Sequence, residues 1–243
     1  MYVLQSLSKH FDLNHFTDII SARAIIAKLL YVTPVRRLLY VGDLTRGNFV
    51  HRLEHLSCYL GGVFALGVST LPPDVLPPEE KELHAWAAKG LTYTCALVYA
   101  DQLSGLGPDE VTMPPRTGRK WIREIQKWKE GGRTGPAPGT GEPPAEMNLT
   151  KRDYWNTWAN TYMLRPEVCV SPFNSSIFFD DVFLFKTVES LFYMWRTTGD
   201  IKWRERGYEI FQAIESQTRT KYGYSTAYGI DGSHVSYRDY MPR

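Results

Sequence analysis

The sequence has few cysteines, little net charge and no long apolar run, and each shortage excludes a class of protein. Three cysteines in 243 residues, with no Cys-x-x-Cys pair, do not make a disulfide-dense scaffold or a typical structural zinc site. The formal net charge of +2 gives no reason to expect a nucleic-acid partner. Arg23 and Lys28 interrupt the longest apolar candidate, and no basic start precedes an apolar block. We therefore expect neither a transmembrane segment nor a targeting signal in this chain.

Helical periodicity is what the sequence does have. Hydrophobic residues make up 43% of the chain, enough for a sizeable core, and they recur at a spacing of 3.6 in several stretches. Thr198-Gly199-Asp200 separates two such stretches and is typical of a helix that ends at a glycine before the next begins. Strand signals are weak, so we predict an all-α chain of paired antiparallel helices. The expected helices lie near residues 17–32, 50–68, 83–98, 117–130, 151–164, 188–195 and 203–214.

Two stretches interrupt this pattern. Residues 131–147 are rich in proline and glycine and predict a surface loop. Residues 168–186 are dense in Phe, Val and Ser and fit neither the helix before nor the helix after.

Three short motifs could bear chemistry. His51-Arg-Leu-Glu54-His55 matches the H-x-x-E-H pattern of inverted zinc proteases, and on a helix its two histidines would share a face. No third ligand is evident, so a solvated or core-edge histidine pair is the favoured interpretation. Arg165-Pro166-Glu167 would place two charges at a helix junction, where a surface ion pair is the simpler alternative. Glu189 could be an ordinary first-turn glutamate favoured by the helix dipole.

Several segments together resemble one family. His55 to Gly67, Leu164-Arg-Pro-Glu167, Thr187 to Arg196 and the stretch from Thr198 to Glu215 are similar to segments of the class I α-1,2-mannosidases, glycoside hydrolase family 47. Gly105-Leu-Gly-Pro-Asp109 fits a further segment, and the likeness covers most of residues 33–240. It implies an incomplete (α/α)7 barrel, with residues 1–243 a partial catalytic domain. It also implies a calcium-dependent glycosidase that removes terminal α-1,2-linked mannose from high-mannose N-glycans with inversion. A non-catalytic, lectin-like glycan-binding member of the same fold is the alternative.

The resemblance assigns roles to individual residues. Glu167 would be the catalytic base, Arg165 and His55 would bind the sugar, and Glu189 would contact calcium through water. A disulfide is implied between Cys58 and Cys95, with Cys169 unpaired. In the endoplasmic reticulum or Golgi, Asn148 of the sequon Asn148-Leu-Thr150 would be a glycosylation site, and the full-length protein could be a signal-anchored membrane protein.

The departures from the family pattern are equally specific. In the family, Leu-Arg-Pro-Glu runs directly into Thr-Val-Glu-Ser, whereas residues 168–186 stand between them here. Their removal would put Glu189 three positions after Glu167, on one helix face. We interpret 168–186 as a retained intron read through in frame, and transcripts that join codon 167 to codon 187 would confirm this. The sequence offers no counterpart to the family's general acid or calcium-binding threonine, so we expect an incomplete, weak or inactive fragment.

Overall fold

The computed structural model describes residues 15–141, 152–157, 160–163, 186–232 and 235–238. The helices are α2 (His15–Lys28), η1 (His55–Cys58), α3 (Tyr59–Thr70), α4 (Pro78–Ala100), α5 (Trp121–Glu130), α6 (Lys186–Thr198) and α7 (Ile201–Thr218). The strands are β1 (Leu30–Val32), β2 (Leu39–Val41), β3 (Asp43–Thr45), β4 (Asn48–Val50), β5 (Arg52–Glu54), β6 (Glu110–Thr112), β7 (Arg119–Lys120), β8 (Trp155–Asn156), β9 (Thr161–Tyr162), β10 (Arg219–Thr220), β11 (Gly223–Tyr224), β12 (Thr226–Tyr228) and β13 (Ser236–Arg238).

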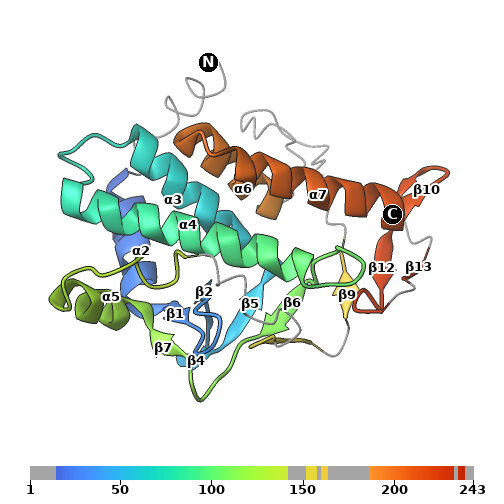
Figure 1. Cartoon of the computed structure of the whole chain (residues 1–243), viewed down its shortest axis with the longest axis horizontal. Helices are drawn as coiled ribbons and strands as arrows, with labels where there is room; N and C mark the ends of the chain where they lie inside the picture. The colour runs from blue at the N-terminus through green and yellow to red at the C-terminus, as the bar shows by residue number, and fades with distance from the viewer. Residues whose placement is uncertain (1–14, 142–151, 158–159, 164–185, 233–234, 239–243) are drawn as a thin grey trace, which may run out of the picture.

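Helices α3, α4, α6 and α7 form one layer, with the strands from β1 to β7 along one side of it and β10 to β13 at the end of α7 (Figure 1). Each helix of the pairs α3–α4 and α6–α7 returns alongside its partner after a short connection. The apolar stripe expected on α4 is buried in the core, including Ala87, Leu91, Cys95 and Val98. At the α6–α7 junction, Gly199 adopts a φ of 74° and the Asp200 side chain accepts a 3.0 Å hydrogen bond from the Lys202 amide. The predicted helix end and restart are therefore both present.

Two glycines let α3 approach its neighbours closely. A Cβ atom at position 61 would lie 3.1 Å from the backbone nitrogen of Thr92 on α4. One at position 62 would lie 2.9 Å from Tyr193 Cδ2 and 3.0 Å from Ser190 Oγ on α6. The pair Gly61-Gly62 thus sets how closely α3 packs against both helices.

Replacing Gly61 with alanine is expected to lower the free energy of unfolding by about 1–3 kcal/mol, because the added methyl group overpacks the α3–α4 contact. Gly67→Ala on the same helix is the matched control, since its Cβ would meet only Leu71 Cδ1, at 3.6 Å. Alanine there should raise stability by roughly 0.5–1 kcal/mol through helix propensity. Urea unfolding of both variants measures this, and equal effects would contradict the close approach.

The strands correct four of the predicted helices. The predicted 17–32 helix gives way to β1 at Leu30, and β7 occupies the beginning of the predicted 117–130 helix, so that α5 starts at Trp121. Val50 ends β4 and Arg52–Glu54 is β5, so helix begins only at His55. Within 151–164, the described residues form β8 and β9 instead of a helix. Asn156 pairs with Val111, and Tyr162 pairs with Ala227, both in antiparallel register. Strands β8 and β9 have two residues each, too few to show an alternating pattern, and their partners are distant in sequence.

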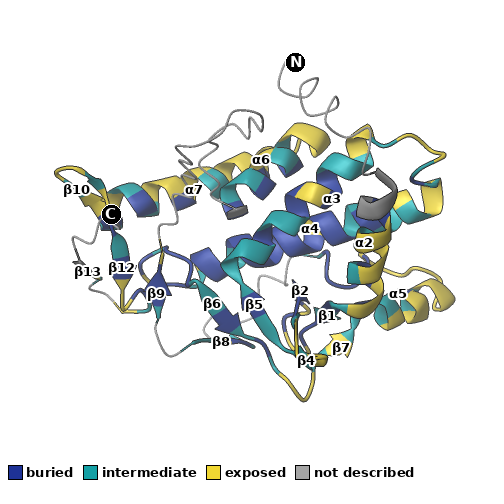
Figure 2. Cartoon of the chain, turned by 180° about the vertical axis from the view of Figure 1, so that it is seen from behind, coloured by how far each residue is buried: buried dark blue, intermediate teal, exposed yellow. Residues whose placement is uncertain are grey.

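Helices α6 and α7 have exposed residues on their outer faces (Figure 2), and several of these residues are apolar. Phe192 is 51% exposed, Tyr208 60% and Phe211 51%. These three large apolar side chains are therefore exposed to solvent on helices whose other faces pack in the core. Phe192 and Phe211 recur at helical spacing with more buried residues of their own helices, but periodicity alone does not reveal which positions face a neighbouring helix.

One histidine is fully inside the helix layer. His84 of α4 is 3% exposed and packs edge-on against Phe64 of α3, with ring centroids 5.2 Å apart. Burial lowers the pKa of His84 to about 4, because the cationic ring would lose its hydration.

Because the His84 ring is buried, we expect the free energy of unfolding to fall as the pH is lowered. The unfolded chain binds a proton near pH 6.5, while the folded chain does not until about pH 4. Between about pH 7 and pH 5 this group should remove about 2 kcal/mol from the free energy of unfolding. His84→Gln should flatten that part of the profile, whatever it costs at neutral pH. Urea unfolding across this range tests it, and parallel profiles for the two proteins would contradict it.

Candidate active site

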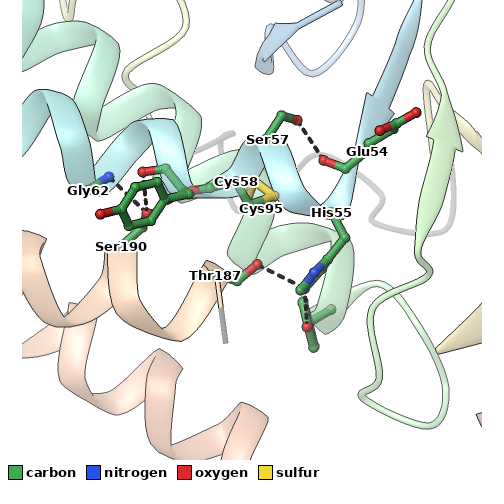
Figure 3. The surroundings of a disulfide bond; sticks show 10 residues. Glu54, His55, Ser57, Cys58, Gly62, Cys95, Thr187 and Ser190 are labelled. Carbon is green, nitrogen blue, oxygen red and sulfur yellow. Dashed lines mark hydrogen bonds between the residues drawn. A yellow bond between two sulfur atoms is a disulfide. The ribbon is translucent and has the colours of Figure 1, made fainter. Parts of the chain in front are cut away.

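The candidate site lies where η1, the end of α4 and the start of α6 meet (Figure 3). His55 is the first residue of η1, immediately after β5, and its amide donates a 2.9 Å hydrogen bond to the Asp109 carbonyl. This bond extends the β5–β6 ladder, in which Glu54 lies opposite Glu110. The backbone before His55 is therefore held by a strand pair and the backbone after it by a helix.

The ring of His55 is oriented by two hydroxyl groups. Its Nε2 atom lies 2.6 Å from Tyr99 Oη at the end of α4 and 3.3 Å from Thr187 Oγ1 at the start of α6. Burial holds the pKa of Tyr99 well above its ordinary value of 10, so the phenol stays protonated. With the phenol as donor, Nε2 accepts and the ring proton is on Nδ1.

A disulfide holds two of these groups together. Cys58 and Cys95 are bonded, with Cα atoms 5.9 Å apart, which confirms the pairing expected from the resemblance. Cys58 follows His55 by three residues, and Cys95 precedes Tyr99 by four, about one helical turn. The bond therefore fixes η1 against α4 within one turn of the His55–Tyr99 contact.

Helix α6 is attached to the same place by Ser190. The Ser190 hydroxyl donates to the Cys58 carbonyl at 2.7 Å and accepts from the Gly62 amide at 2.8 Å. The side chain is fully buried, so both backbone groups are satisfied without water. Together with Thr187, this contact places the first turn of α6 beside η1.

Glu189 lies on that first turn. Burial is the main cause that raises the pKa of Tyr59, to about 12, and it also raises the pKa of Tyr193. The negative charge of the Glu189 carboxylate adds to both shifts. The carboxylate thus lies near phenol rings from α3 and α6, and its Oε2 atom is buried. An acidic group in this position can accept hydrogen bonds from water or from a ligand.

The structure describes some of the predicted site residues and not others. His55 and the turn that carries Glu189 come together, although they are far apart in sequence. Arg165, Glu167, Cys169 and Asn148 lie outside the described residues, as do residues 168–185. Tyr99 and Thr187 were not singled out from the sequence. The usable signal for Tyr99 was its position one helical turn after Cys95.

The histidine pair does not form a zinc motif. His51 lies between β4 and β5, so His51 and His55 do not share a helix face. His51 Nδ1 lies 2.6 Å from Tyr40 Oη, while His55 faces Tyr99. Within residues that the structure describes, no three His, Cys, Asp or Glu side chains are grouped to bind a metal ion. These contacts favour the interpretation of His51 and His55 as histidines at the edge of the core.

Comparison with known proteins identifies the family. A model of glycosyl hydrolase family 47 matches residues 1–242. The chain belongs to this family. It is 30% identical over 214 residues to the endoplasmic reticulum mannosyl-oligosaccharide 1,2-alpha-mannosidase of Rattus norvegicus, covering 86% of this chain and 24% of that protein. It is 27% identical over 201 residues to mannosyl-oligosaccharide alpha-1,2-mannosidase IA of Drosophila melanogaster, covering 83% of this chain and 21% of the relative.

A solved structure has the same fold. The alpha-1,2-mannosidase from Trichoderma reesei matches with a TM-score of 0.62 and 23% identity, covering 97% of this chain and 40% of that one. The expected fold, an incomplete (α/α)7 barrel of paired helices, is thereby confirmed. The family 47 chain spans less than half of that structure, and about a quarter or less of the two relatives above.

Proposed function

We propose that this family 47 chain carries part of the machinery for inverting hydrolysis of terminal α-1,2-linked mannose on high-mannose N-glycans. The observation that supports this most directly is the meeting of His55 with the start of α6, across 132 residues of sequence. Two of the segments that resemble the mannosidases are joined there, and Glu189 is on the same turn. His55, held by Tyr99 and Thr187, presents its ring in one orientation, as recognition of a sugar hydroxyl requires.

The proposed chemistry needs two carboxyl groups, one to protonate the leaving oxygen and one to activate water. We assign Glu167 as the base that activates water, with Arg165 and His55 binding sugar hydroxyls. The sequence contains no residue that we can assign as the acid. The chain alone is therefore proposed to be a weak or inactive hydrolase, and full activity is proposed for the whole protein.

Calcium is the proposed cofactor, although the described residues do not complete a site for it. Calcium takes six to eight oxygen ligands, and the described part of the chain offers no group of three candidate side chains. Glu189 can supply hard carboxylate oxygens through water, and we assign it only that role.

The secretory pathway, in the endoplasmic reticulum or Golgi, is the proposed location. The Cys58–Cys95 disulfide supports this, because such bonds persist in oxidising compartments. The partners are then high-mannose glycans on glycoproteins, and Asn148 is a proposed glycosylation site. No helix in the described ranges is long and apolar enough to cross a membrane.

The test compares this chain with a variant that lacks residues 168–186, using α-1,2-mannobiose with calcium or with a chelator. Because the deletion joins Glu167 to Thr187, we expect it to raise turnover by roughly 100-fold, the scale on which misplaced catalytic groups lose rate. Proton NMR should show β-mannose as the first product. Glu167→Gln and His55→Ala should remove the gain, while Asp74→Ala on an exposed loop should not.

Three results would contradict the proposal. Retention of configuration would exclude an inverting reaction, and turnover that survives Glu167→Gln would exclude that residue as the base. Tight binding of the disaccharide without turnover in both proteins would assign the chain to the lectin-like class.

A further inference from the structure

A basic cleft lies between β1, β7 and α5, built from other residues than the candidate active site. Its volume is about 380 Å³, and it is partly open to solvent. Six side chains line it: Tyr31, Arg119, Lys120, Arg123, Glu124 and Lys127. We call it the basic cleft.

The sheet register and the helix period bring these side chains together. Lys120 of β7 pairs directly with Tyr31 of β1, which puts both side chains on the same face of the sheet. Arg123, Glu124 and Lys127 follow Lys120 at positions i+3, i+4 and i+7, one stripe along α5. The stripe on the opposite side, with Trp121 and Ile125, is buried in the core. Because Trp121 and Ile125 hold one side of α5 in the core, the stripe with Arg123, Glu124 and Lys127 lines the cleft.

The charge of the basic cleft is concentrated. Four cationic side chains surround one carboxylate, a net +3, whereas the whole chain has a net charge of only +2. Glu124 lies 3.7 Å from Arg119 and 3.4 Å from Lys127 and so neutralises part of their charge. Lys120 and Arg123 form no ion pair with any residue in the described ranges. These two cations remain available for an anion.

Tyr31 completes the lining with a neutral hydroxyl. Its ring stacks on Phe49, with centroids 4.2 Å apart, which fixes the phenol in place. Burial raises the pKa of Tyr31, and the nearby charge of Arg123 opposes that shift. Tyr31 and Arg123 line the same cleft, so the phenol can donate a hydrogen bond to an anion that Arg123 binds.

We propose that the basic cleft binds the phosphate group of a phosphate monoester, with Lys120 and Arg123 as the charged ligands and Tyr31 as a hydroxyl donor. Arg side chains bind phosphate oxygens in a fork, and Lys adds a point charge. The volume suits one phosphate group with a sugar-sized substituent. Free phosphate and a phosphorylated sugar share this chemistry, and the experiment distinguishes them.

The test is isothermal titration of the full chain at low ionic strength, in separate runs with inorganic phosphate, mannose 6-phosphate and mannose. Lys120→Gln/Arg123→Gln should weaken phosphate binding by about tenfold or more, because two hydrogen bonds to a charged ligand are lost. Tyr31→Phe keeps the ring stack and should weaken binding by a smaller factor. Lys89→Gln, an exposed cation on α4, is the matched control and should leave binding unchanged. Circular dichroism checks that each variant is folded.

The outcomes separate cleanly. If mannose 6-phosphate binds more tightly than both phosphate and mannose, the site takes a phosphorylated sugar. Equal affinity for the two phosphates identifies free phosphate as the ligand. Absence of phosphate binding up to about 10 mM, or binding that the double variant leaves undiminished, overturns the proposal. Because the readout is binding, the result does not depend on the proposed mannosidase activity.

Discussion

Replacing both Cys58 and Cys95 with alanine is expected to lower the free energy of unfolding by about 4 kcal/mol. The disulfide closes a loop of sequence separation 37, and the chain-entropy relation gives this magnitude for a loop of that length. Both cysteines are buried, so the variant also loses packing between η1 and α4. Because the bond lies within one turn of both His55 and Tyr99, the contact between those two side chains should loosen.

Urea unfolding of the two proteins, without reducing agent, measures the loss. Cys169→Ala is the matched control, since the resemblance leaves this cysteine unpaired, and it should change stability little. Addition of a reducing agent should lower the stability of the parent chain toward that of the double variant. A loss below about 1 kcal/mol would mean that the bond does not restrain the unfolded state as the loop length implies.

Asp101→Ala should be comparably damaging, with an expected loss of about 3–5 kcal/mol. Asp101 follows the last residue of α4 and forms a two-pronged ion pair with Arg36, at 2.5 and 3.2 Å. The Tyr154 hydroxyl donates to the same carboxylate at 2.6 Å. The Arg36 and Asp101 side chains are almost wholly buried, at 1% and 4% exposure. Removal of the carboxylate would leave a cation and a phenol in the core without their acceptor.

The control for this prediction is Asp74→Ala, which removes an exposed carboxylate and should change the free energy of unfolding by less than about 0.5 kcal/mol. A double replacement, Arg36→Met with Asp101→Leu, should recover most of the loss, because a buried ion pair can be exchanged for apolar packing. If Asp101→Ala alone costs less than about 1 kcal/mol, water enters the network and the pair is not structurally important.

The helices could be predicted from the sequence where burial imposes a period on it. Helix α4 is the clearest case, because Leu91, Cys95 and Val98 recur at helical spacing and all face the core. The strands β8 and β9 could not, since two residues carry no period. Their conformation depends on pairing with segments such as β6 and β12, which are distant in sequence. The local sequence predicts a helix at these residues, but pairing with distant strands determines their extended conformation.

The candidate site was predictable only through resemblance. His55 belongs to a motif, and the disulfide beside it followed from the same likeness. Tyr99 looks like one more apolar position at the end of the α4 stripe, and nothing local shows that its hydroxyl meets a histidine 44 residues earlier. Such contacts depend on where the ends of helices fall in space, which sequence spacing does not specify.

The Ser190 contact also has a kinetic consequence. The hairpins α3–α4 and α6–α7 are closed by short connections, so each can form early from local interactions. Ser190 reaches Cys58 across 132 residues and can make its bonds only after both hairpins exist. The meeting of η1 and α6 is then a late event in folding. Partially folded molecules should accordingly have native-like helical circular dichroism before the surroundings of His55 are assembled.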